Sequence, residues 1–353
     1  MSSRTSSLTP PADRRRLAAT VKKLETWFLR NQRELPWRLS YDPYQIWLSE
    51  VMLQQTRMNV VLPYFQRFLA RFPSIRDLAA AREEDVLTAW SGLGYYRRAR
   101  MLLAGARHVV AIHGGQLPDQ RPAVEKIPGV GRYTSGAILS IAFNQREPIV
   151  DGNVARVLAR LDALEAPTGS GELASAEWLI ADEMVKLAAS PRNFNQSLME
   201  LGATICTPRL PACGSCPVSR DCRAYRMSAV EQFPRPKTSR PVVSLEIPLL
   251  LMCEGGRVLL RKMSGPLMDG MYHLPHGNDL LLEATRGIEQ GRSLGTFKHT
   301  VTHRRIEFHL FEGHGSGTIA DGPGEFIWIA PGDLGNLPHP SYVAKAIRMW
   351  LKR

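Results

Sequence analysis

Apolar residues recur three or four positions apart from about Ala18 to Leu201, and turn-forming residues separate the periodic segments. This spacing predicts amphipathic helices. One helix should begin at Asp42-Pro43-Tyr44-Gln45, where an N-cap acid precedes a first-turn proline and a glutamine occupies a capping-box position. A sharp turn over 127–134 precedes a predicted helix over 135–143, and another amphipathic helix is expected over 154–164. No convincing series of strands accompanies them, so we expect this region to be all-α.

The pattern changes after residue 233. Residues 233–241 are rich in proline and basic side chains and cannot continue a helix. We therefore expect a linker over 228–243. Beyond it, Glu254-Gly255-Gly256 predicts a hairpin turn. Strands are expected over 242–252, 257–262, 297–311 and 325–329, and a closing helix over 341–351. Residues 244–353 should form a separate α+β domain.

A chain of 353 residues is long enough for two or three domains with their own cores. We assign residues 18–227 to one helical domain. The segment 1–17 is rich in Ser, Thr, Pro and Arg, which predicts a disordered basic tail. A mitochondrial targeting segment is the weaker alternative, because Asp13 counts against it.

Hydropathy argues against a membrane protein. The longest apolar run covers only residues 247–252, whereas a membrane helix needs ~20 residues. No secretory signal peptide is visible at the N-terminus. We expect no membrane association and a cytoplasmic location.

The net charge of +12 suggests a polyanionic partner, most often nucleic acid. Arginine far outnumbers lysine, so an arginine-rich proteome explains the charge equally well. Charge alone does not separate these two interpretations.

Four of the five cysteines lie within 17 positions, in the spacing Cys-x6-Cys-x2-Cys-x5-Cys: Cys206, Cys213, Cys216 and Cys222. In a cytosolic chain such a cluster favours a metal site over disulfides. Four thiolates can hold a [4Fe–4S] cluster or a zinc ion. Zinc sites usually show two Cys-x2-Cys pairs, and this chain has one.

Residues Ile127-Pro128-Gly129-Val130-Gly131 predict a glycine-rich turn between two helices. Gly129 and Gly131 would let backbone N–H groups approach a phosphate, and the start of the next helix favours negative charge. A tight helical hairpin without a ligand is the alternative. The basic charge of the chain makes us prefer DNA.

Two carboxylates are candidate catalytic groups. Glu50 lies in a largely apolar helix, where burial would raise its pKa towards that of a usable general acid. The motif alone favours an ordinary surface glutamate. Asp151 precedes a new helix, whose N-terminus favours the ionised form of the aspartate. The alternative is that Asp151 serves only as the N-cap of that helix. Asn153 could hold that cap instead and leave Asp151 facing the site. A neutral acid beside a charged one suits cleavage of a glycosidic bond.

Five motifs then follow one another along the chain: Leu-Pro-Trp-Arg at 35–38, Trp-Leu-Ser-Glu-Val-Met-Leu-Gln-Gln-Thr at 47–56, Gly-Leu-Gly-Tyr-Tyr at 92–96, Pro-Gly-Val-Gly-Arg at 128–132 and Val-Asp-Gly-Asn-Val at 150–154. This series resembles the MutY adenine glycosylases of the helix–hairpin–helix, endonuclease III-like superfamily. The resemblance runs from about residue 25 to 225 and extends more weakly to the C-terminus.

The resemblance implies the chemistry. Glu50 would protonate N7 of an adenine that has been flipped out of duplex DNA. Asp151 would stabilise the oxocarbenium-like sugar, with Asn153 and Tyr133 supporting it. Adenine mispaired with 8-oxoguanine or guanine would be the substrate, and we expect a monomeric enzyme.

The resemblance also implies DNA-contacting residues. Arg38 and Gln196 are candidates for the base pocket. A second set would fill or wedge the space that the flipped base leaves, or lie beside it: Leu53, Gln54, Gln55, Thr56 and Tyr95. For Leu53 and Tyr95 taken singly, ordinary core packing explains the residue equally well. The same likeness favours iron–sulfur over zinc at the four cysteines.

Tyr133 discriminates within the superfamily. The bifunctional endonuclease III-like enzymes carry a lysine after the Gly-Val-Gly-Arg turn, where it attacks the sugar as a Schiff-base nucleophile. A phenol cannot form that imine, so we expect a monofunctional glycosylase.

In MutY proteins the C-terminal region resembles a Nudix fold that reads 8-oxoguanine. Gly277 and Glu283 keep the first spacing of a Nudix box, but Gly291 and Arg292 stand where Arg-Glu should be, so we expect no nucleotide hydrolysis. Thr302 and His303 occupy the lesion-reading loop, where Val301 replaces the usual Phe. A hydrogen-bonded strand histidine is the alternative for His303.

Two competing functions remain. A glycosylase/lyase for oxidised pyrimidines is disfavoured by Tyr133 and by the long C-terminal domain. A non-catalytic lesion-binding protein would need neither Glu50 nor Asp151.

Overall fold

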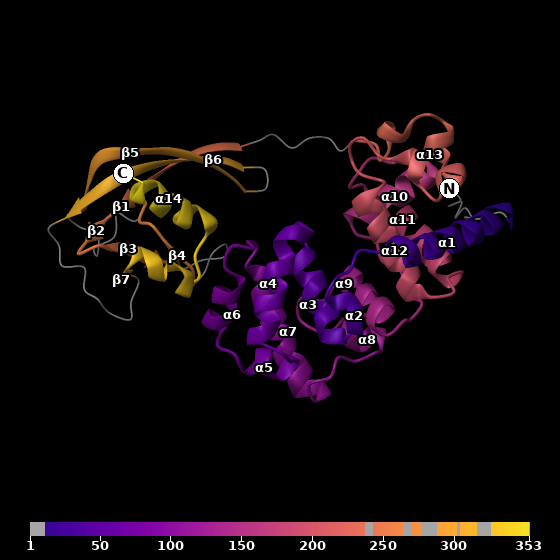
Figure 1. Ribbon diagram of the computed structural model, residues 1–353, viewed down its shortest axis with the longest axis horizontal. Coiled ribbons are helices and arrows are strands. Elements are labelled where there is room, and N and C mark those ends of the chain that lie inside the picture. Colours follow the sequence, from indigo (N-terminus) through magenta and orange to yellow (C-terminus); the bar gives the residue numbers. More distant parts are fainter. Residues whose placement is uncertain are drawn as a thin grey trace, which may run out of the picture. The chain divides into compact units, whose positions relative to one another are not determined.

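The computed structural model describes residues 11–236, 243–263, 270–276, 288–301, 304–315 and 326–352 (Figure 1). The chain divides into two compact units. The first contains residues 1–55, 74–76 and 104–238, and the second contains residues 56–73, 77–103 and 239–353. The predicted boundary between helical and α+β domains differs from this division, because the helical stretches 56–73 and 77–103 group with the C-terminal region.

The first unit is helical. Its elements are α1 (Pro11–Asn31), α2 (Trp37–Ser40), α3 (Pro43–Leu53), α8 (Arg121–Val124), α9 (Arg132–Ala137), the π-helix η1 (Ile138–Ala142), α10 (Gly152–Asp162), α11 (Gly171–Lys186), α12 (Pro191–Thr204), α13 (Arg223–Arg226) and the 3₁₀ turns η2 (Cys213–Ser215), η3 (Ser219–Asp221) and η4 (Val230–Gln232). Short helix α5 (Ile75–Ala80) and helix α7 (Arg97–His113) contribute to both units.

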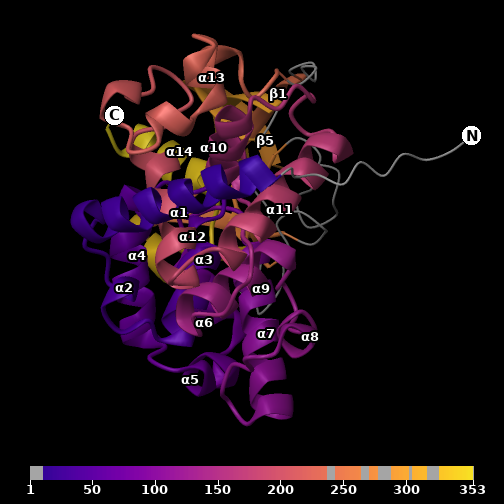
Figure 2. The ribbon, with the colours of Figure 1, turned by 90° about the vertical axis from the view of Figure 1, so that its right-hand side faces the viewer.

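One apolar core holds α1, α10, α11 and α12 together. Leu24, Leu158, Met184 and Leu198 are each fully buried in it. Figure 2 shows α1 lying across α12. Since α10 and α12 both pack in this core, the loops at their ends are held at fixed positions.

The start of α3 is as predicted. Asp42 caps the helix, because its Oδ1 accepts a hydrogen bond of 2.9 Å from the backbone N–H of Gln45. Trp47 packs against Gly105 of α7, where a Cβ would lie only 2.7 Å from the indole ring. This close approach fixes α3 against α7.

Two predicted boundaries are wrong. The disordered tail was expected over 1–17, but α1 begins at Pro11, and Leu17 is 3% exposed because it packs in the helical core. The linker was expected over 228–243, but residues up to 236 are placed in the first unit. Phe233 is buried there against Ala224 and Ala229.

The second unit contains α4 (Met58–Arg71), α6 (Glu83–Trp90) and two sheets. Its strands are β1 (Val243–Leu251), β2 (Cys253–Glu254), β3 (Arg257–Lys262), β4 (Tyr272–His273), β5 (Ile288–Val301), β6 (Arg304–Gly315) and β7 (Phe326–Ile329). The 3₁₀ helix η7 (Pro331–Asn336) and helix α14 (Ser341–Leu351) follow.

One sheet has the order β1-β6-β5, with β1 parallel and β5 antiparallel to β6. In the other, β3 pairs with β2, β4 and β7. Leu249, Phe308 and Val343 share one core between the strands and α14 (Figure 1). The predicted α+β character of this region is confirmed, and Gly255 and Gly256, with φ of +56° and +76°, form the predicted turn between β2 and β3. The prediction of a single strand over 297–311 is wrong, because β5 ends at Val301 and β6, its antiparallel partner, begins at Arg304.

No helix within the described ranges is long and apolar enough to cross a bilayer.

Candidate active site and cysteine loop

Glu50 is buried in the middle of α3, with 4% of its surface exposed. Ile46, Trp47 and Val51 around it are buried as well, so α3 lacks the polar face on which an ordinary surface glutamate would lie. Burial raises the pKa of Glu50 to about 7, the neighbouring Asp151 charge adds to the rise, and Tyr133 and Arg38 oppose it. The surface interpretation is therefore wrong, and with a pKa of about 7 Glu50 is protonated in about half of the molecules at neutral pH.

Tyr133 lies in the first turn of α9 and donates a hydrogen bond of 2.5 Å from its hydroxyl to Oε2 of Glu50. Burial raises the pKa of this phenol well above its ordinary value, and the charges of Glu50 and Asp151 raise it further. Tyr133 is thus a neutral hydrogen-bond donor to the Glu50 carboxyl.

Asp151 is itself the N-cap of α10. Its Oδ1 accepts hydrogen bonds from the backbone N–H groups of Asn153 at 3.0 Å and Val154 at 2.7 Å. The idea that Asn153 holds the cap is wrong, since its Nδ2 instead donates to Oδ2 of Asp151 at 3.3 Å. Capping occupies chiefly one oxygen, so the other is left for a second partner.

The helix N-terminus does not lower the pKa of Asp151 below its ordinary value. Burial raises it, and the N–H groups of Val154 and Asn153 and the charge of Arg156 act in the opposite direction. Because the charge of Asp151 acts on Glu50 and both carboxylates act on Tyr133, the structure brings these three side chains to one partly buried site.

Arg38 is held beside this site by three acceptors. Its guanidinium donates to Oε1 of Gln196 at 2.9 Å, to the carbonyl of Arg33 at 3.0 Å and to Oε2 of Glu200 at 2.8 Å. Gln196 and Glu200 are both buried. Although burial opposes ionisation, Arg33 and Arg38 lower the pKa of Glu200. Our sequence reasoning missed Glu200, although it lies four residues after Gln196 on one face of α12.

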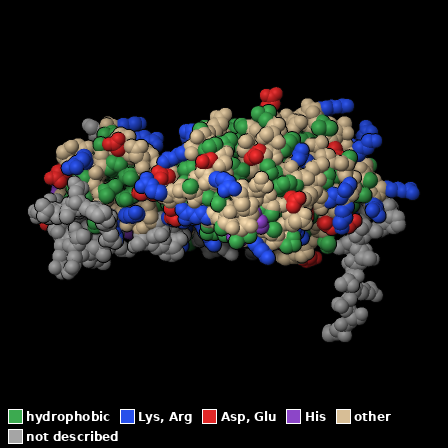
Figure 3. Space-filling view, turned by 90° about the horizontal axis from the view of Figure 1, so that it is seen from below, with side chains coloured by type: hydrophobic (Ala, Val, Ile, Leu, Met, Phe, Trp, Pro, Cys, Tyr) green, Lys and Arg blue, Asp and Glu red, His purple; other side chains and the backbone are tan. Residues whose placement is uncertain are grey.

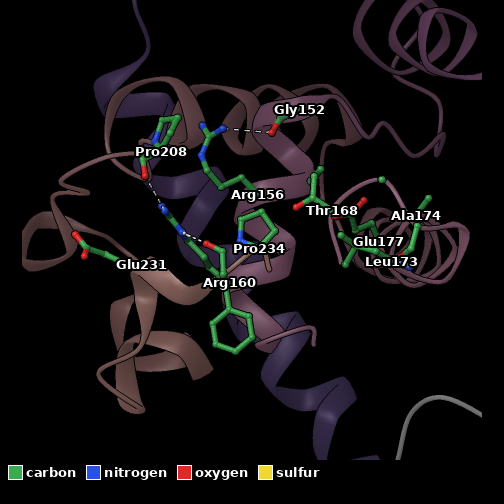
Figure 4. A pocket seen from close by; sticks show the side chains of 14 residues that line it. Gly152, Arg156, Arg160, Thr168, Leu173, Ala174, Glu177, Pro208, Glu231 and Pro234 are labelled. Atoms are coloured by element: carbon green, nitrogen blue, oxygen red, sulfur yellow. Dashed lines mark hydrogen bonds between the residues drawn. The ribbon is translucent and has the colours of Figure 1, made fainter. Parts of the chain in front are cut away.

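Arg156 connects the Asp151 cap with the cysteine loop. It donates to Oδ1 of Asn153 and to the carbonyls of Gly202 and Cys206, each at 2.8 Å. Gly202 allows this contact, since a Cβ there would lie 2.7 Å from Cβ of Asn153. Figure 4 shows Arg156 folded back over the start of α10. The spacing of 153, 156 and 160 on one helix face is a signal that could have identified it.

The four cysteines come from the end of α12 and the short turns that follow. All of them line one small cavity together with Arg160, Ile205, Ser219, Tyr225 and Val230. Burial chiefly, together with the neighbouring Cys206, Cys222 and Cys213, raises the pKa of Cys216 to about 12 against the opposing hydrogen bond to the backbone at Val218. Within the described residues no group of three or more His, Cys, Asp or Glu side chains is placed to hold a single metal ion.

Arg160 is almost fully buried next to this cavity, with 2% exposure. It donates to Sγ of Cys206 at 3.4 Å and to the carbonyls of Thr207 at 2.7 Å and Phe233 at 2.9 Å. Figure 4 shows its further hydrogen bond to the carbonyl of Pro208, at 3.3 Å. One guanidinium therefore holds both ends of the loop segment.

The turn before α9 has the conformation that its glycines allow. Gly129 has a φ of +80°, which side-chain-bearing residues rarely adopt. Gly131 is the N-cap residue of α9, and a Cβ built on it would meet nothing within 4 Å. Both glycines are exposed, so their surroundings leave space for a ligand.

The residues expected to fill or border the space that an extruded base leaves come from two segments, the end of α3 and the turn before α7. Leu53 ends α3 and is half-buried, Gln54 is the C-cap, and Gln55 is exposed with a φ of +57°. Thr56 accepts a hydrogen bond from Arg98 at 3.1 Å. Tyr95 is 44% exposed with a φ of +50°, so simple core packing does not explain it.

The lesion-reading prediction for Thr302 and His303 lies outside the described residues, as do Gly277 and Glu283. Gly291 and Arg292 lie in β5, and Arg292 forms an ion pair with Glu312 of β6. On the face drawn in Figure 3, Lys and Arg side chains are scattered among acidic and apolar ones.

Comparison with known proteins agrees with this architecture. A family model described as "HhH-GPD superfamily base excision DNA repair protein" matches residues 48–179. A solved structure of a thermostable thymine-DNA glycosylase aligns with a TM-score of 0.53 and 29% identity, covering 61% of this chain and 99% of that one.

Two curated relatives extend the match. The Adenine DNA glycosylase of Arabidopsis thaliana is 41% identical over 349 residues, covering 80% of this chain, which spans about half, 55%, of that protein's length. The Adenine DNA glycosylase of Buchnera aphidicola subsp. Baizongia pistaciae is 34% identical over 280 residues, covering 77% of this chain and 79% of that protein. The chain therefore belongs to the adenine DNA glycosylase (MutY) family of the HhH-GPD superfamily.

Proposed function

We propose that this protein is a monofunctional DNA glycosylase that excises adenine mispaired with 8-oxoguanine or guanine during base excision repair. The observation that carries the proposal is the group formed by buried Glu50 and half-buried Tyr133 and Asp151, in which the pKa of Glu50 is raised to about 7. The family relationship adds the base, since both curated relatives described above are named adenine DNA glycosylases.

Glu50 acts first as the general acid. With a pKa of about 7 it carries a proton that it can donate to N7 of the extruded adenine. The bond between the sugar C1′ and adenine N9 then breaks, and its electron pair leaves with the protonated base. Tyr133 donates a hydrogen bond that stabilises the Glu50 carboxylate left behind.

Asp151 stabilises the positive sugar that this step produces. The N–H groups of Asn153 and Val154 and the charge of Arg156 favour its ionised form against burial. Water then attacks C1′ and gives its proton to Glu50, which restores the acid for another turnover. Tyr133 supplies no amine, so no imine forms and the strand is not cleaved.

Arg38, Gln196 and the exposed turns would handle the DNA. Arg38 and Gln196, which are hydrogen-bonded to each other, would border the base pocket, and Arg38 lowers the pKa of Glu50 through its charge. Gly129 and Gly131 would accept a phosphate on their backbone N–H groups. Leu53, Gln54, Gln55, Thr56 and Tyr95 would enter or border the gap in the stack.

The four cysteines would hold a [4Fe–4S] cluster. All four line one cavity, and the cluster is wider than a single ion, so its ligands lie farther apart than those of zinc. Cys206, Cys213, Cys216 and Cys222 would be the ligands. Bound there, the cluster would act as a structural staple for the loop, which Arg156 links to the Asp151 cap.

The C-terminal region would be a Nudix-like reader of the opposite base without nucleotide hydrolysis. This rests on the sequence of Thr302, His303 and the incomplete Nudix box. The enzyme would act as a cytoplasmic monomer on duplex DNA.

Single-turnover assays on duplexes with A:8-oxoG, A:G and oxidised pyrimidines test the proposal. We expect adenine release from the first two, and strand cleavage only after added alkali. Release of an oxidised pyrimidine together with borohydride trapping would establish the lyase alternative instead. His303→Ala should reduce the preference for A:8-oxoG over A:G, and an unchanged preference would remove His303 from lesion reading.

A further inference from the structure

Seven described residues other than glycine have a positive φ, which side-chain-bearing residues rarely adopt, and the exposed Gln55 and Tyr95 are two of them. Gln55 has a φ of +57° and Tyr95 a φ of +50°. Tyr95 follows Gly92 and Gly94, whose φ angles of +99° and +70° continue the same tight turn. Strained residues persist only where their surroundings fix them, and they cluster at functional sites.

Arg98 makes hydrogen bonds to residues next to Gln55 and Tyr95. Its Nη2 donates to Oγ1 of Thr56 at 3.1 Å, to the carbonyl of Gly94 at 3.2 Å and to the carbonyl of Leu93 at 3.4 Å. Thr56 directly follows Gln55 in the chain, and Leu93 and Gly94 directly precede Tyr95. One guanidinium therefore joins the two strained turns.

The same guanidinium contacts aromatic rings. It lies 5.5 Å from the centroid of the fully buried Trp90 and 5.4 Å from that of Tyr95. Nε1 of Trp90 also donates to the carbonyl of Gly94, at 3.2 Å. Arg98 and the Gly94 carbonyl thus connect the exposed Tyr95 ring to the buried Trp90 side chain.

Arg98 remains a cation under working conditions. Burial lowers its pKa to about 10, which still leaves it protonated at neutral pH. A planar guanidinium can reach several acceptors at once, whereas a lysine ammonium at this position would lose the forked geometry.

We propose that Arg98 is a positioning residue that locks Thr56 and the Tyr95 ring in the orientation needed to enter the DNA stack, so that it controls base extrusion rather than bond cleavage. The inference rests on the proposed function, in which the turns at 53–56 and 92–95 contact the duplex where the adenine is extruded.

Paired substitutions at both ends of the contact test the inference in the full-length protein. Thr56→Val removes the acceptor oxygen at nearly constant shape, and Thr56→Ser restores it. Arg98→Met removes the donor. Arg97→Met is the matched control, because Arg97 is exposed on the same turn of α7 and carries the same charge.

Extrusion is measured by stopped-flow fluorescence on a duplex with 2-aminopurine beside the mispaired adenine, in a Glu50→Gln background that prevents turnover. We expect Thr56→Val and Arg98→Met to lower the extrusion equilibrium by about tenfold or more, since a hydrogen bond to a charged group is lost. Thr56→Ser keeps the acceptor oxygen and should restore the extrusion that Thr56→Val loses. Arg97→Met should weaken binding to matched and mispaired duplexes equally.

Unchanged extrusion in Thr56→Val, or equal loss in Thr56→Ser and Thr56→Val, would overturn the inference. If Arg98→Met lacks a cooperative melting transition, the Thr56 pair still decides. Failure of the proposed function is distinct: it would appear as a parent protein that releases adenine from none of the duplexes.

Discussion

Two glutamates, Glu50 and Glu177, are buried and have similar pKa values for partly different reasons. Burial raises the pKa of Glu50 to about 7, and burial raises that of Glu177 to about 7 as well. Glu177 lines a cavity of about 430 Å³ whose wall includes Gly152, the residue after Asp151 (Figure 4).

Their surroundings differ. Glu50 receives a hydrogen bond from Tyr133 and interacts with the charges of Asp151 and Arg38, whereas burial is the sole cause of the shift at Glu177. A raised pKa therefore marks a desolvated carboxyl, and only a neighbouring donor and a second charge make it a candidate catalytic group. Substituting each group in turn separates the two roles.

Glu50→Gln should have the largest effect. It removes the transferable proton but keeps the shape, so adenine release under single-turnover conditions should fall by about 10²–10⁴-fold. Duplex affinity, measured in parallel by anisotropy, should change little. Near-normal release would show that another group supplies the proton.

Asp151→Asn should have the next largest effect. The amide oxygen can still cap α10, so the melting temperature should hold, while loss of the negative charge should slow release by about 10²–10³-fold. Calorimetry and single-turnover kinetics together check this. A large loss of stability with little loss of rate would make Asp151 a structural cap only.

Tyr133→Phe should mainly move the pH profile. The phenol lowers the pKa of Glu50, so its removal should raise that pKa above about 7. Because release needs protonated Glu50, the decline of the rate with rising pH should shift to more alkaline values. A profile that stays in place, or moves towards acid, would contradict the assignment of Tyr133 as the donor.

Glu177→Gln should leave adenine release unchanged and raise stability. The folded pKa of about 7 exceeds the ordinary value of 4.5, so the unfolded chain gives up this proton first and folding loses stability between these pH values. At pH 8 the free energy of unfolding of the variant should exceed that of the parent by up to about 2 kcal/mol, after allowing for solvent in the cavity. Below about pH 4 the two free energies should be equal. Denaturant unfolding at both pH values measures it. Reduced release would instead assign Glu177 a part in the reaction.

Helix α3 and the catalytic candidates could be predicted from the sequence, because the signals that mark them lie in neighbouring residues. The Asp42 cap and the apolar run after it depend on neighbouring residues, and so does the glycine turn before α9. The burial of Glu50 could not be predicted from α3 itself, because α9 and η1 supply the surface that covers that helix.

Long-range contacts account for what the sequence could not show. Glu200 beside Arg38 and the Arg98–Thr56 contact each join residues far apart in the chain. The parallel pairing of β1 with β6 and the groupings of helical segments also depend on tertiary packing. The early start of α1 follows from the core that Leu17 enters, which a polar, proline-containing tail does not reveal.

Single-turnover adenine release by Glu50→Gln and Glu177→Gln, measured side by side on an A:8-oxoG duplex, tests the central claim most directly. Both changes neutralise a buried carboxyl with a pKa near 7. We predict that Glu50→Gln loses release while Glu177→Gln releases adenine at the parental rate. Equal rates in the two variants would contradict the account.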